Sequence, residues 1–145
     1  MTYYAVTDTN VLVSSMLKFK SIPWYITYLI EANTIIPLFN EEILEEYYDV
    51  LTRNDFGFEQ KRVEELIQLI KTKGLFIERK KAIEVFIDKT DIVFFEIVMG
   101  ARHTMDAYLV TGNMRHYPVR SYVVTPREMI GIIEKENGPI QIDCK

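Results

Sequence analysis

The chain alternates short apolar runs with longer segments in which apolar residues recur at helical spacing. Runs rich in β-branched and aromatic residues predict five strands, at residues 3–7, 34–39, 75–78, 107–111 and 121–125. Helical periodicity predicts six helices, at residues 11–17, 24–32, 41–52, 59–73, 91–99 and 126–134. Strands that alternate with helices predict an α/β fold in which helices cover both faces of a parallel sheet.

Residues at the expected ends of these elements support the boundaries. Ser21, followed by a proline in the first turn, is placed to begin the second helix, and Asn40 is placed to cap the third. Gly74 ends the fourth helix, and Pro37 is expected to interrupt the second strand near its end. The fifth helix is apolar on nearly all sides except at Glu96, so we expect it to be deeply buried.

Composition indicates a single globular domain spanning residues 1–145. The hydrophobic fraction is 48% and the mean hydropathy is −0.01, values that suit a chain with a buried core. No apolar run is long enough to span a membrane, and the N-terminus lacks the features of a secretory signal. We therefore expect no membrane partner. The single cysteine, Cys144, cannot form an internal disulfide, which suits a reducing compartment, so we expect a cytoplasmic protein.

The formal net charge of −4 does not by itself favour a nucleic acid as partner. An enzyme acting on nucleic acid could still carry this charge if acidic residues gathered at a metal site while basic residues formed a rim. The small basic cluster Arg79-Lys80-Lys81 is expected to be a solvated surface, or less commonly part of such a rim.

Acidic residues from distant parts of the chain are expected at one edge of the sheet. Asp8 ends the first strand, Asp91 opens the helix before the fourth strand, and Asn113 follows that strand. Crossover helices run antiparallel to the strands, so each helix begins at the carboxyl edge, where open α/β sheets bind ligands. Glu46, in the second turn of the helix after the second strand, starts from the same side. Asp106 enters the fourth strand from the opposite edge and is excluded.

Each of these acids also has a purely structural interpretation. Asp8 alone is more simply explained as a helix N-cap that accepts backbone N–H bonds. Asp91 belongs to a capping segment, residues 88–91, in which it would favour the helix dipole. Glu46 borders the buried stripe of its helix, but a solvated helix face is the simpler interpretation of any single glutamate.

Three carboxylates gathered at one place repel each other unless a cation neutralises them or one takes up a proton. Oxygen ligands without a Cys/His cluster suit Mg²⁺ or Mn²⁺ rather than zinc. Ions of this kind commonly meet phosphate-bearing substrates, where they activate water and stabilise charge on the leaving oxygen.

Four short motifs, of which the first three contain these acids and the fourth contains Asn113, follow one another along most of the chain, up to about Pro118. They are Thr7-Asp8-Thr9-Asn10-Val11-Leu12-Val13-Ser14, Ile43-Leu44-Glu45-Glu46-Tyr47-Tyr48-Asp49-Val50-Leu51, Asp88-Lys89-Thr90-Asp91-Ile92-Val93-Phe94 and Tyr108-Leu109-Val110-Thr111-Gly112-Asn113. In this order the motifs resemble those of the PIN-domain family, in particular the ribonuclease toxins of bacterial toxin–antitoxin pairs (the VapC-like group).

The resemblance implies an α/β/α sandwich around a parallel sheet of about five strands. It also implies Mg²⁺- or Mn²⁺-dependent cleavage of RNA phosphodiester bonds, with Asp8, Glu46 and Asp91 as the catalytic metal ligands. The family usually has a fourth acid where this chain has Asn113. Asparagine ligates weakly and brings no charge, so this departure bears on the occupancy of a second metal position and on turnover.

Neutral and basic residues near these acids receive supporting roles from the same resemblance. Asn10 and Thr111 would orient carboxylates or water beside the ligands. Arg115 and His116 follow the site and could contact substrate phosphate, although a surface histidine without a catalytic role is the simpler interpretation.

The leading hypothesis is a metal-dependent endoribonuclease, the toxin of a toxin–antitoxin pair, with a protein antitoxin as its natural partner. The family also suggests a homodimer. The alternative is a PIN-like module that binds RNA or protein without turnover, a hypothesis motivated by Asn113 and by the acidic charge. A phosphotransfer enzyme of the haloacid-dehalogenase type ranks last, because Asn10 replaces the second aspartate of its opening motif and no lysine follows the fourth strand.

Overall fold

The computed structural model describes residues 1–84, 86 and 89–140, and within them five parallel strands form one sheet between helices. The strands are β1 (Tyr3–Thr7), β2 (Ile35–Phe39), β3 (Leu75–Phe76), β4 (Ala107–Val110) and β5 (Val123–Val124). The helices are α1 (Thr9–Leu17), α2 (Ile22–Glu31), α3 (Glu41–Leu51), α4 (Gln60–Lys73), α5 (Lys89–Ala101), α6 (Pro126–Asn137) and a short 3-10 helix, η1 (Met114–His116). The predicted α/β fold is therefore confirmed.

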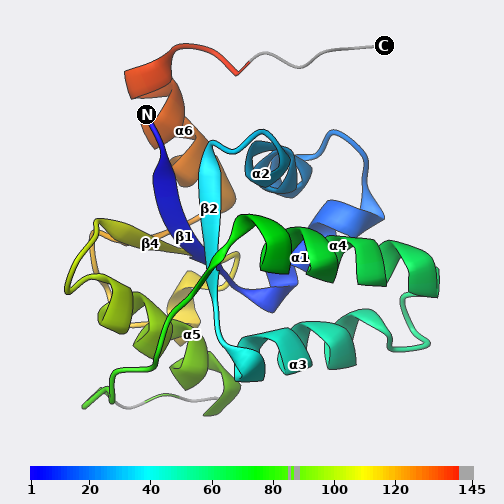
Figure 1. Ribbon diagram of the computed structural model, residues 1–145, viewed down its shortest axis with the longest axis horizontal. Helices are drawn as coiled ribbons and strands as arrows, with labels where there is room; N and C mark the ends of the chain where they lie inside the picture. Colours follow the sequence, from blue (N-terminus) through cyan, green and yellow to red (C-terminus); the bar gives the residue numbers. More distant parts are fainter. Residues whose placement is uncertain (85, 87–88, 141–145) are drawn as a thin grey trace.

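Strand β1 lies at the centre of the sheet, whose order is β3-β2-β1-β4-β5. Tyr4 of β1 lies opposite Ile36 of β2 on one side and Ala107 of β4 on the other. The chain leaves β1 toward α1, and β2 runs the same way into α3 (Figure 1). Because every pairing in the sheet is parallel, the residues that follow β1, β2 and β4 all emerge at one edge.

Helices cover both faces of the sheet and create two hydrophobic cores. Helices α3, α4 and α5 pack over one face, which contributes Val6 and Leu109. Helices α2 and α6 pack over the other face, which contributes Ala5 and Val110. Successive side chains of a strand point to opposite faces, so neighbouring residues serve different cores. The result is the predicted three-layer arrangement.

Side-chain caps confirm the predicted starts of two helices. The Ser21 hydroxyl accepts a hydrogen bond from the Trp24 N–H at 3.3 Å, and Asn40 Oδ1 accepts one from the Ile43 N–H at 2.9 Å. Helix α6 continues three residues past its predicted end at residue 134. It stops at Gly138, whose φ of 82° lies in the left-handed region that favours glycine.

Three strands differ from their predicted form. The edge strands β3 and β5 have two residues each and are shorter than predicted. Strand β2 continues through Pro37, which lies opposite Ala5 of β1, so the predicted interruption is wrong. A proline removes only its own N–H from the ladder, and β2 pairs with β3 at the next residue, Leu38.

Two residues singled out from the sequence, Asp88 and Cys144, lie outside the described ranges, so the predicted cap of α5 and the cysteine stay predictions. Within the described ranges, no helix combines the length and the apolar composition that crossing a bilayer requires.

Candidate active site

Asp8 lies at the junction of β1 and α1, and its carboxylate turns away from the helix. Asp8 is at the N-cap position, yet its side chain makes no hydrogen bond to the first turn of α1, which the structure describes in full. Its Oδ2 instead accepts hydrogen bonds from Thr111 Oγ1 at 2.8 Å and from the Tyr117 hydroxyl at 3.0 Å. The cap interpretation of this residue therefore fails, and the carboxylate belongs to a cluster at the carboxyl ends of β1 and β4.

Asp91 joins this cluster from the first turn of α5. Its Oδ1 lies 3.3 Å from the same Tyr117 hydroxyl. The two carboxylates therefore lie within two hydrogen-bond lengths of each other, and only 6% of Asp8 and 7% of Asp91 is exposed. The structure thus brings together two of the three acids predicted from the sequence.

Tyr117 is the site residue that the sequence analysis missed. Burial raises the pKa of its phenol far above the ordinary value, and the charges of Asp8 and Asp91 raise it further. The hydroxyl consequently keeps its proton, and the two carboxylates share the hydrogen bond that it donates. The signal available in the sequence was its position, since Tyr117 directly follows His116, one of the predicted substrate contacts.

A second buried tyrosine supports the backbone just before Asp8. The Tyr47 hydroxyl, on α3, donates a hydrogen bond to the carbonyl oxygen of Thr7. Burial raises the pKa of Tyr47, the charge of Asp8 adds to this effect, and the bond to Thr7 opposes it. This contact ties α3 to the end of β1.

The loop after β4 is held by the two neutral residues predicted as supporting groups. Asn10 Oδ1 accepts a hydrogen bond from the Gly112 N–H at 3.0 Å, and Thr111 Oγ1 accepts one from the Asn113 N–H at 3.0 Å. Thr111 therefore contacts both the loop and Asp8. The Asn113 side chain is exposed, and the hydrogen bonds described for this residue are those of its backbone.

Of the two basic residues of η1, His116 lies beside Asp91. His116 Nδ1 is 3.2 Å from Asp91 Oδ2, a contact that becomes an ion pair when the imidazole carries a proton. Arg115, on the same turn, is exposed to solvent. The histidine thus touches one of the candidate carboxylates.

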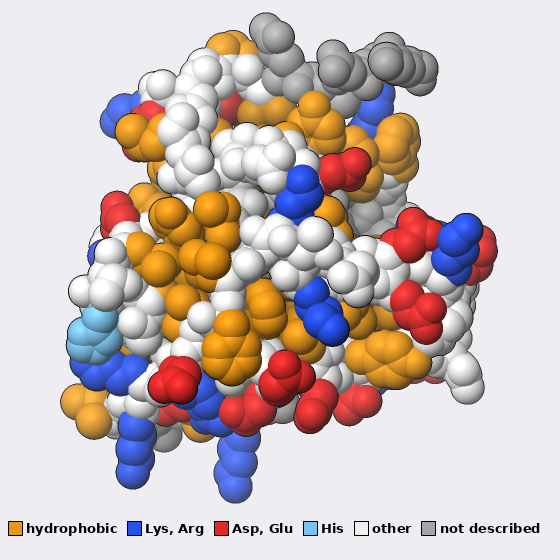
Figure 2. Space-filling model, in the orientation of Figure 1, with side chains coloured by type: hydrophobic (Ala, Val, Ile, Leu, Met, Phe, Trp, Pro, Cys, Tyr) orange, Lys and Arg blue, Asp and Glu red, His pale blue; other side chains and the backbone are white. Residues whose placement is uncertain are grey.

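The third predicted acid is Glu46. It is half-buried on α3, where with Ile43 and three other acids it lines a cavity of about 250 Å³ closed on the α5 side by Val93 and Phe94. Acidic side chains gather over α3 on the face shown in Figure 2. Among the residues that the structure describes, no three Asp, Glu, His or Cys side chains converge as a metal-binding group.

The donor set nevertheless fits a small divalent cation. The nearly buried carboxylates of Asp8 and Asp91 share one neutral donor, the Tyr117 hydroxyl. No lysine or arginine in the described ranges forms an ion pair with Asp8. Like charges this close are unfavourable unless a cation neutralises them or a proton is taken up. Carboxylate oxygens suit Mg²⁺ or Mn²⁺, and Asp8 and Asp91 are the residues that would hold such an ion.

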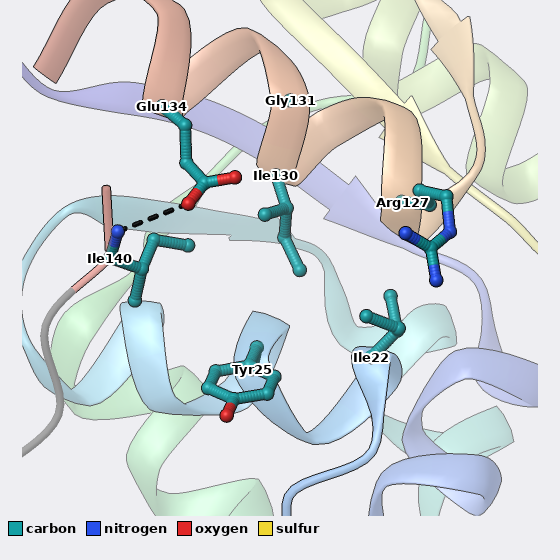
Figure 3. A pocket seen from close by; sticks show the side chains of 7 residues that line it. All are labelled: Ile22, Tyr25, Arg127, Ile130, Gly131, Glu134 and Ile140. Atoms are coloured by element: carbon teal, nitrogen blue, oxygen red, sulfur yellow. Dashed lines mark hydrogen bonds between the residues drawn. The ribbon is translucent and has the colours of Figure 1, made fainter. Parts of the chain in front are cut away.

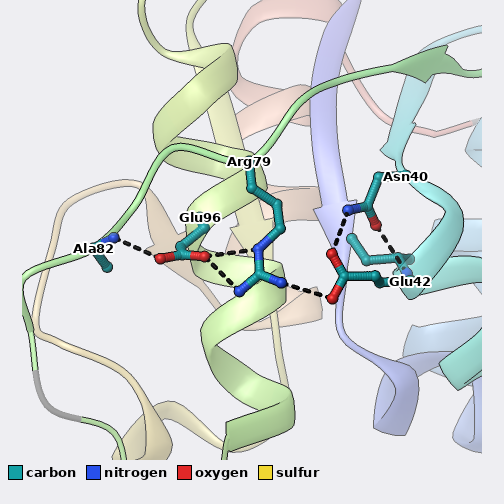
Figure 4. A network of polar contacts seen from close by, with 6 residues as sticks. Asn40, Glu42, Arg79, Ala82 and Glu96 are labelled. Atoms are coloured by element: carbon teal, nitrogen blue, oxygen red, sulfur yellow. Dashed lines mark hydrogen bonds and ion pairs between the residues drawn. The ribbon is translucent and has the colours of Figure 1, made fainter.

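A separate polar network fixes α5 against the segment that follows β3 (Figure 4). Glu96 is buried, and its carboxylate accepts hydrogen bonds from Arg79 Nε at 2.7 Å and from the Ala82 N–H at 2.6 Å. Arg79 also pairs with Glu42 of α3 at 2.6 Å. The cluster Arg79-Lys80-Lys81 is exposed to solvent, as predicted, but Arg79 also forms ion pairs, because a buried charge such as that of Glu96 needs a partner.

A larger cavity lies away from the acidic edge. It has a volume of about 350 Å³ between α2 and α6, and Ile22, Tyr25 and Ile130 form much of its lining (Figure 3). At one end, Glu134 accepts a hydrogen bond from the Ile140 N–H at 3.1 Å. None of the predicted site residues lines it.

Comparison with models of known protein families matches residues 4–115 to the PIN domain. Searches among curated proteins and among solved structures gave no match. The matched segment contains Asp8, Glu46 and Asp91 and ends at Arg115. Tyr117, which bridges two of these acids, lies just beyond it.

Proposed function

The chain belongs to the PIN-domain family, and from this premise we propose that it is a metal-dependent endoribonuclease centred on Asp8 and Asp91. PIN domains are typically nucleases that act on RNA and use Mg²⁺ or Mn²⁺. The observation that carries the proposal is the nearly buried carboxylate pair that shares the Tyr117 hydroxyl at the carboxyl edge of the sheet. Asp8 supports it further, because its side chain is not engaged in capping α1.

The residues around the pair have distinct roles in this proposal. Asp8 and Asp91 hold the cation, and Glu46 is the third carboxylate, since it lines the cavity between α3 and the helix that carries Asp91. Thr111 fixes Asp8 by its hydrogen bond, and Asn10 fixes the loop through Gly112. A bound Mg²⁺ or Mn²⁺ supplies activation of water and neutralises charge on the phosphate oxygens.

Substrate contacts are assigned to the turn beside Asp91. Arg115 and His116 are accessible there, and basic side chains attract the phosphate groups of RNA. Asn113, exposed at the start of the same turn, is a weak ligand at most, because its amide carries no charge.

RNA cleavage tests the proposal. A mixed RNA pool is incubated with wild type or Asp8→Asn, with and without Mn²⁺, using protein freed of contaminating nuclease. We expect cutting that requires the metal and disappears in the variant. Equal cutting by both proteins would contradict the assignment of the site.

A second candidate function is a PIN-like module that binds RNA without turnover. It is favoured by the neutral Asn113 and by the lack, within the described ranges, of a converging group of three ligands. Folded wild-type protein that binds the RNA pool but leaves it uncut with Mn²⁺ would support this candidate against the nuclease.

A finer proposal makes the chain the toxin of a VapC-like toxin–antitoxin pair, cytoplasmic, homodimeric and inhibited by a protein antitoxin. The resemblance of its four motifs to that group supports it, as do exposed apolar side chains such as Phe19 for a dimer contact. Expression of the wild type in a bacterium should arrest growth, whereas Asp8→Asn should not. Normal growth with well-expressed wild type would contradict the toxin role.

A further inference from the structure

One hydroxyl group links the two carboxylates assigned to the cation. Tyr117 reaches Oδ2 of Asp8 at 3.0 Å and Oδ1 of Asp91 at 3.3 Å. These residues come from three separate segments: the end of β1, the first turn of α5 and the loop after η1. A tyrosine that only filled the core would not need its hydroxyl at their meeting point.

The bonds to Asp8 select which of its oxygens can meet a cation. Thr111 Oγ1 donates to the same Oδ2 at 2.8 Å. A carboxylate oxygen offers about two lone-pair positions, so Thr111 and Tyr117 together fill those of Oδ2. Oδ1 is then the oxygen that Asp8 can present to a metal ion. On Asp91 the contact with Tyr117 falls on Oδ1, and that with His116 on Oδ2.

Packing holds the Tyr117 ring in one place. Tyr117 is buried, and its ring meets that of Phe86 edge-on, with 6.2 Å between centroids. Its backbone N–H donates to the Met114 carbonyl at 3.2 Å. The hydroxyl is therefore a fixed point against which both carboxylates are placed.

We propose that Tyr117 is a positioning residue whose hydroxyl sets the separation and orientation of Asp8 and Asp91, and through them the affinity for a divalent cation. The proposal rests on the proposed function and extends it to a residue outside the segment matched to the family. Tyr117 is not a metal ligand in this account. It acts through the carboxylates, as outer-shell groups do in metal sites.

Tyr117→Phe removes the hydroxyl and keeps the ring. Metal-free protein is titrated with Mn²⁺ alone by isothermal calorimetry, which needs no RNA. We expect the dissociation constant to rise by about 10–100-fold, the usual effect of losing an outer-shell partner. Tyr3→Phe is the matched control: it removes another buried hydroxyl, at the start of β1 and so at the other end of that strand from Asp8, and should bind Mn²⁺ like the wild type.

The outcomes separate this proposal from the proposed function. Unchanged affinity in folded Tyr117→Phe, or an equal loss in both tyrosine variants, would overturn the positioning role and leave the metal site standing. If Asp8→Asn binds Mn²⁺ as tightly as the wild type does, the proposed function is overturned, and this inference falls with it. If circular dichroism shows that Tyr117→Phe does not fold, Thr111→Val removes the other donor from the same oxygen. Unchanged affinity in that variant would contradict the geometry in the same way.

Discussion

Two buried tyrosine hydroxyls form hydrogen bonds at the edge of the sheet where Asp8 and Asp91 lie. Tyr47 donates to the Thr7 carbonyl, and Tyr117 donates to Asp8 and Asp91. Burial is the main cause of the raised pKa of both phenols, followed by the charge of Asp8. Both groups therefore stay neutral donors through the physiological range, and they approach the acids without adding charge.

Tyr47→Phe should lower the free energy of unfolding by about 1–3 kcal/mol, because the buried Thr7 carbonyl loses its donor. The neighbouring variant Tyr48→Phe is the control, since Tyr48 is exposed and its hydroxyl accepts a bond from Gln60 at the surface. That change should cost less than about 0.5 kcal/mol. Urea denaturation measures both, and equal losses would contradict a structural role for the Tyr47 hydroxyl.

The raised pKa of Tyr47 also predicts a loss of stability at alkaline pH. Its ordinary value is 10.0, and burial raises the value in the folded state. Below pH 10 both states keep the proton, whereas above it the unfolded state releases it first, so stability falls as the pH rises. Urea denaturation between about pH 8 and 11 should give a shallower fall for Tyr47→Phe than for the wild type. Identical slopes would count against this explanation.

Some site residues could be predicted from the sequence because topology determines where they lie. Asp8 follows a parallel strand and Asp91 opens a crossover helix, so alternation of strands and helices was enough to bring them to one edge, whereas the role of Thr111 came from the family resemblance. Tyr117 could not be found in this way. It lies in an irregular loop, where hydrogen bonds and packing, rather than a periodic pattern, decide which way the side chain points.

At the scale of elements, α5 is attached to the segment after β3 through buried Glu96. This helix was predicted to be buried from its apolar pattern, but Glu96, the acid inside that pattern, was left without a role. Its partner Arg79 is 17 positions earlier, in a stretch without periodicity, which is why a solvated cluster was the expected interpretation. The pairing depends on tertiary contact, which local patterns do not encode.

Arg79→Met should destabilise the fold by about 2 kcal/mol, because Glu96 keeps the Ala82 N–H bond but loses its charged partner. The value is below that of a fully buried pair, since about a third of the Arg79 side chain is exposed. Lys81→Met, an exposed change in the same basic cluster, should alter stability by less than about 0.5 kcal/mol. Denaturant unfolding compares the two, and equal effects would contradict the network.

Two glycines of different surroundings test the packing of elements. A Cβ at Gly74 would collide with the backbone oxygens of Pro37 and Ile70, so Gly74→Ala should cost about 1–3 kcal/mol. A Cβ at Gly131, inside α6, would meet nothing within 4 Å. Gly131→Ala should therefore raise stability by up to about 1 kcal/mol through helix propensity. The melting temperature should therefore fall in Gly74→Ala and rise in Gly131→Ala. A shift of the same sign in both variants would contradict this description of the packing.

At the scale of the whole molecule, the parallel sheet decides where chemistry is possible. Strand β1 is central, so the ends of β1, β2 and β4 lie at one edge with Asp8, and α5, which starts at that edge, adds Asp91. The layout follows from the alternation of elements in the sequence. The shortness of the edge strands β3 and β5 does not, because it depends on where the chain leaves the sheet to pack on helices.

The central claim is that Asp8 and Asp91 together hold a divalent cation. The most direct test is the thermal melting temperature with and without Mn²⁺ for wild type, Asp8→Asn, Asp91→Asn and Asp106→Asn, the last an exposed acid paired with Arg102. A ligand that binds only the folded state at 100 times its dissociation constant stabilises it by about 2.7 kcal/mol. We predict that Mn²⁺ raises the melting temperature of wild type and Asp106→Asn alone. An equal rise in all four proteins, or none in the wild type, would contradict the claim.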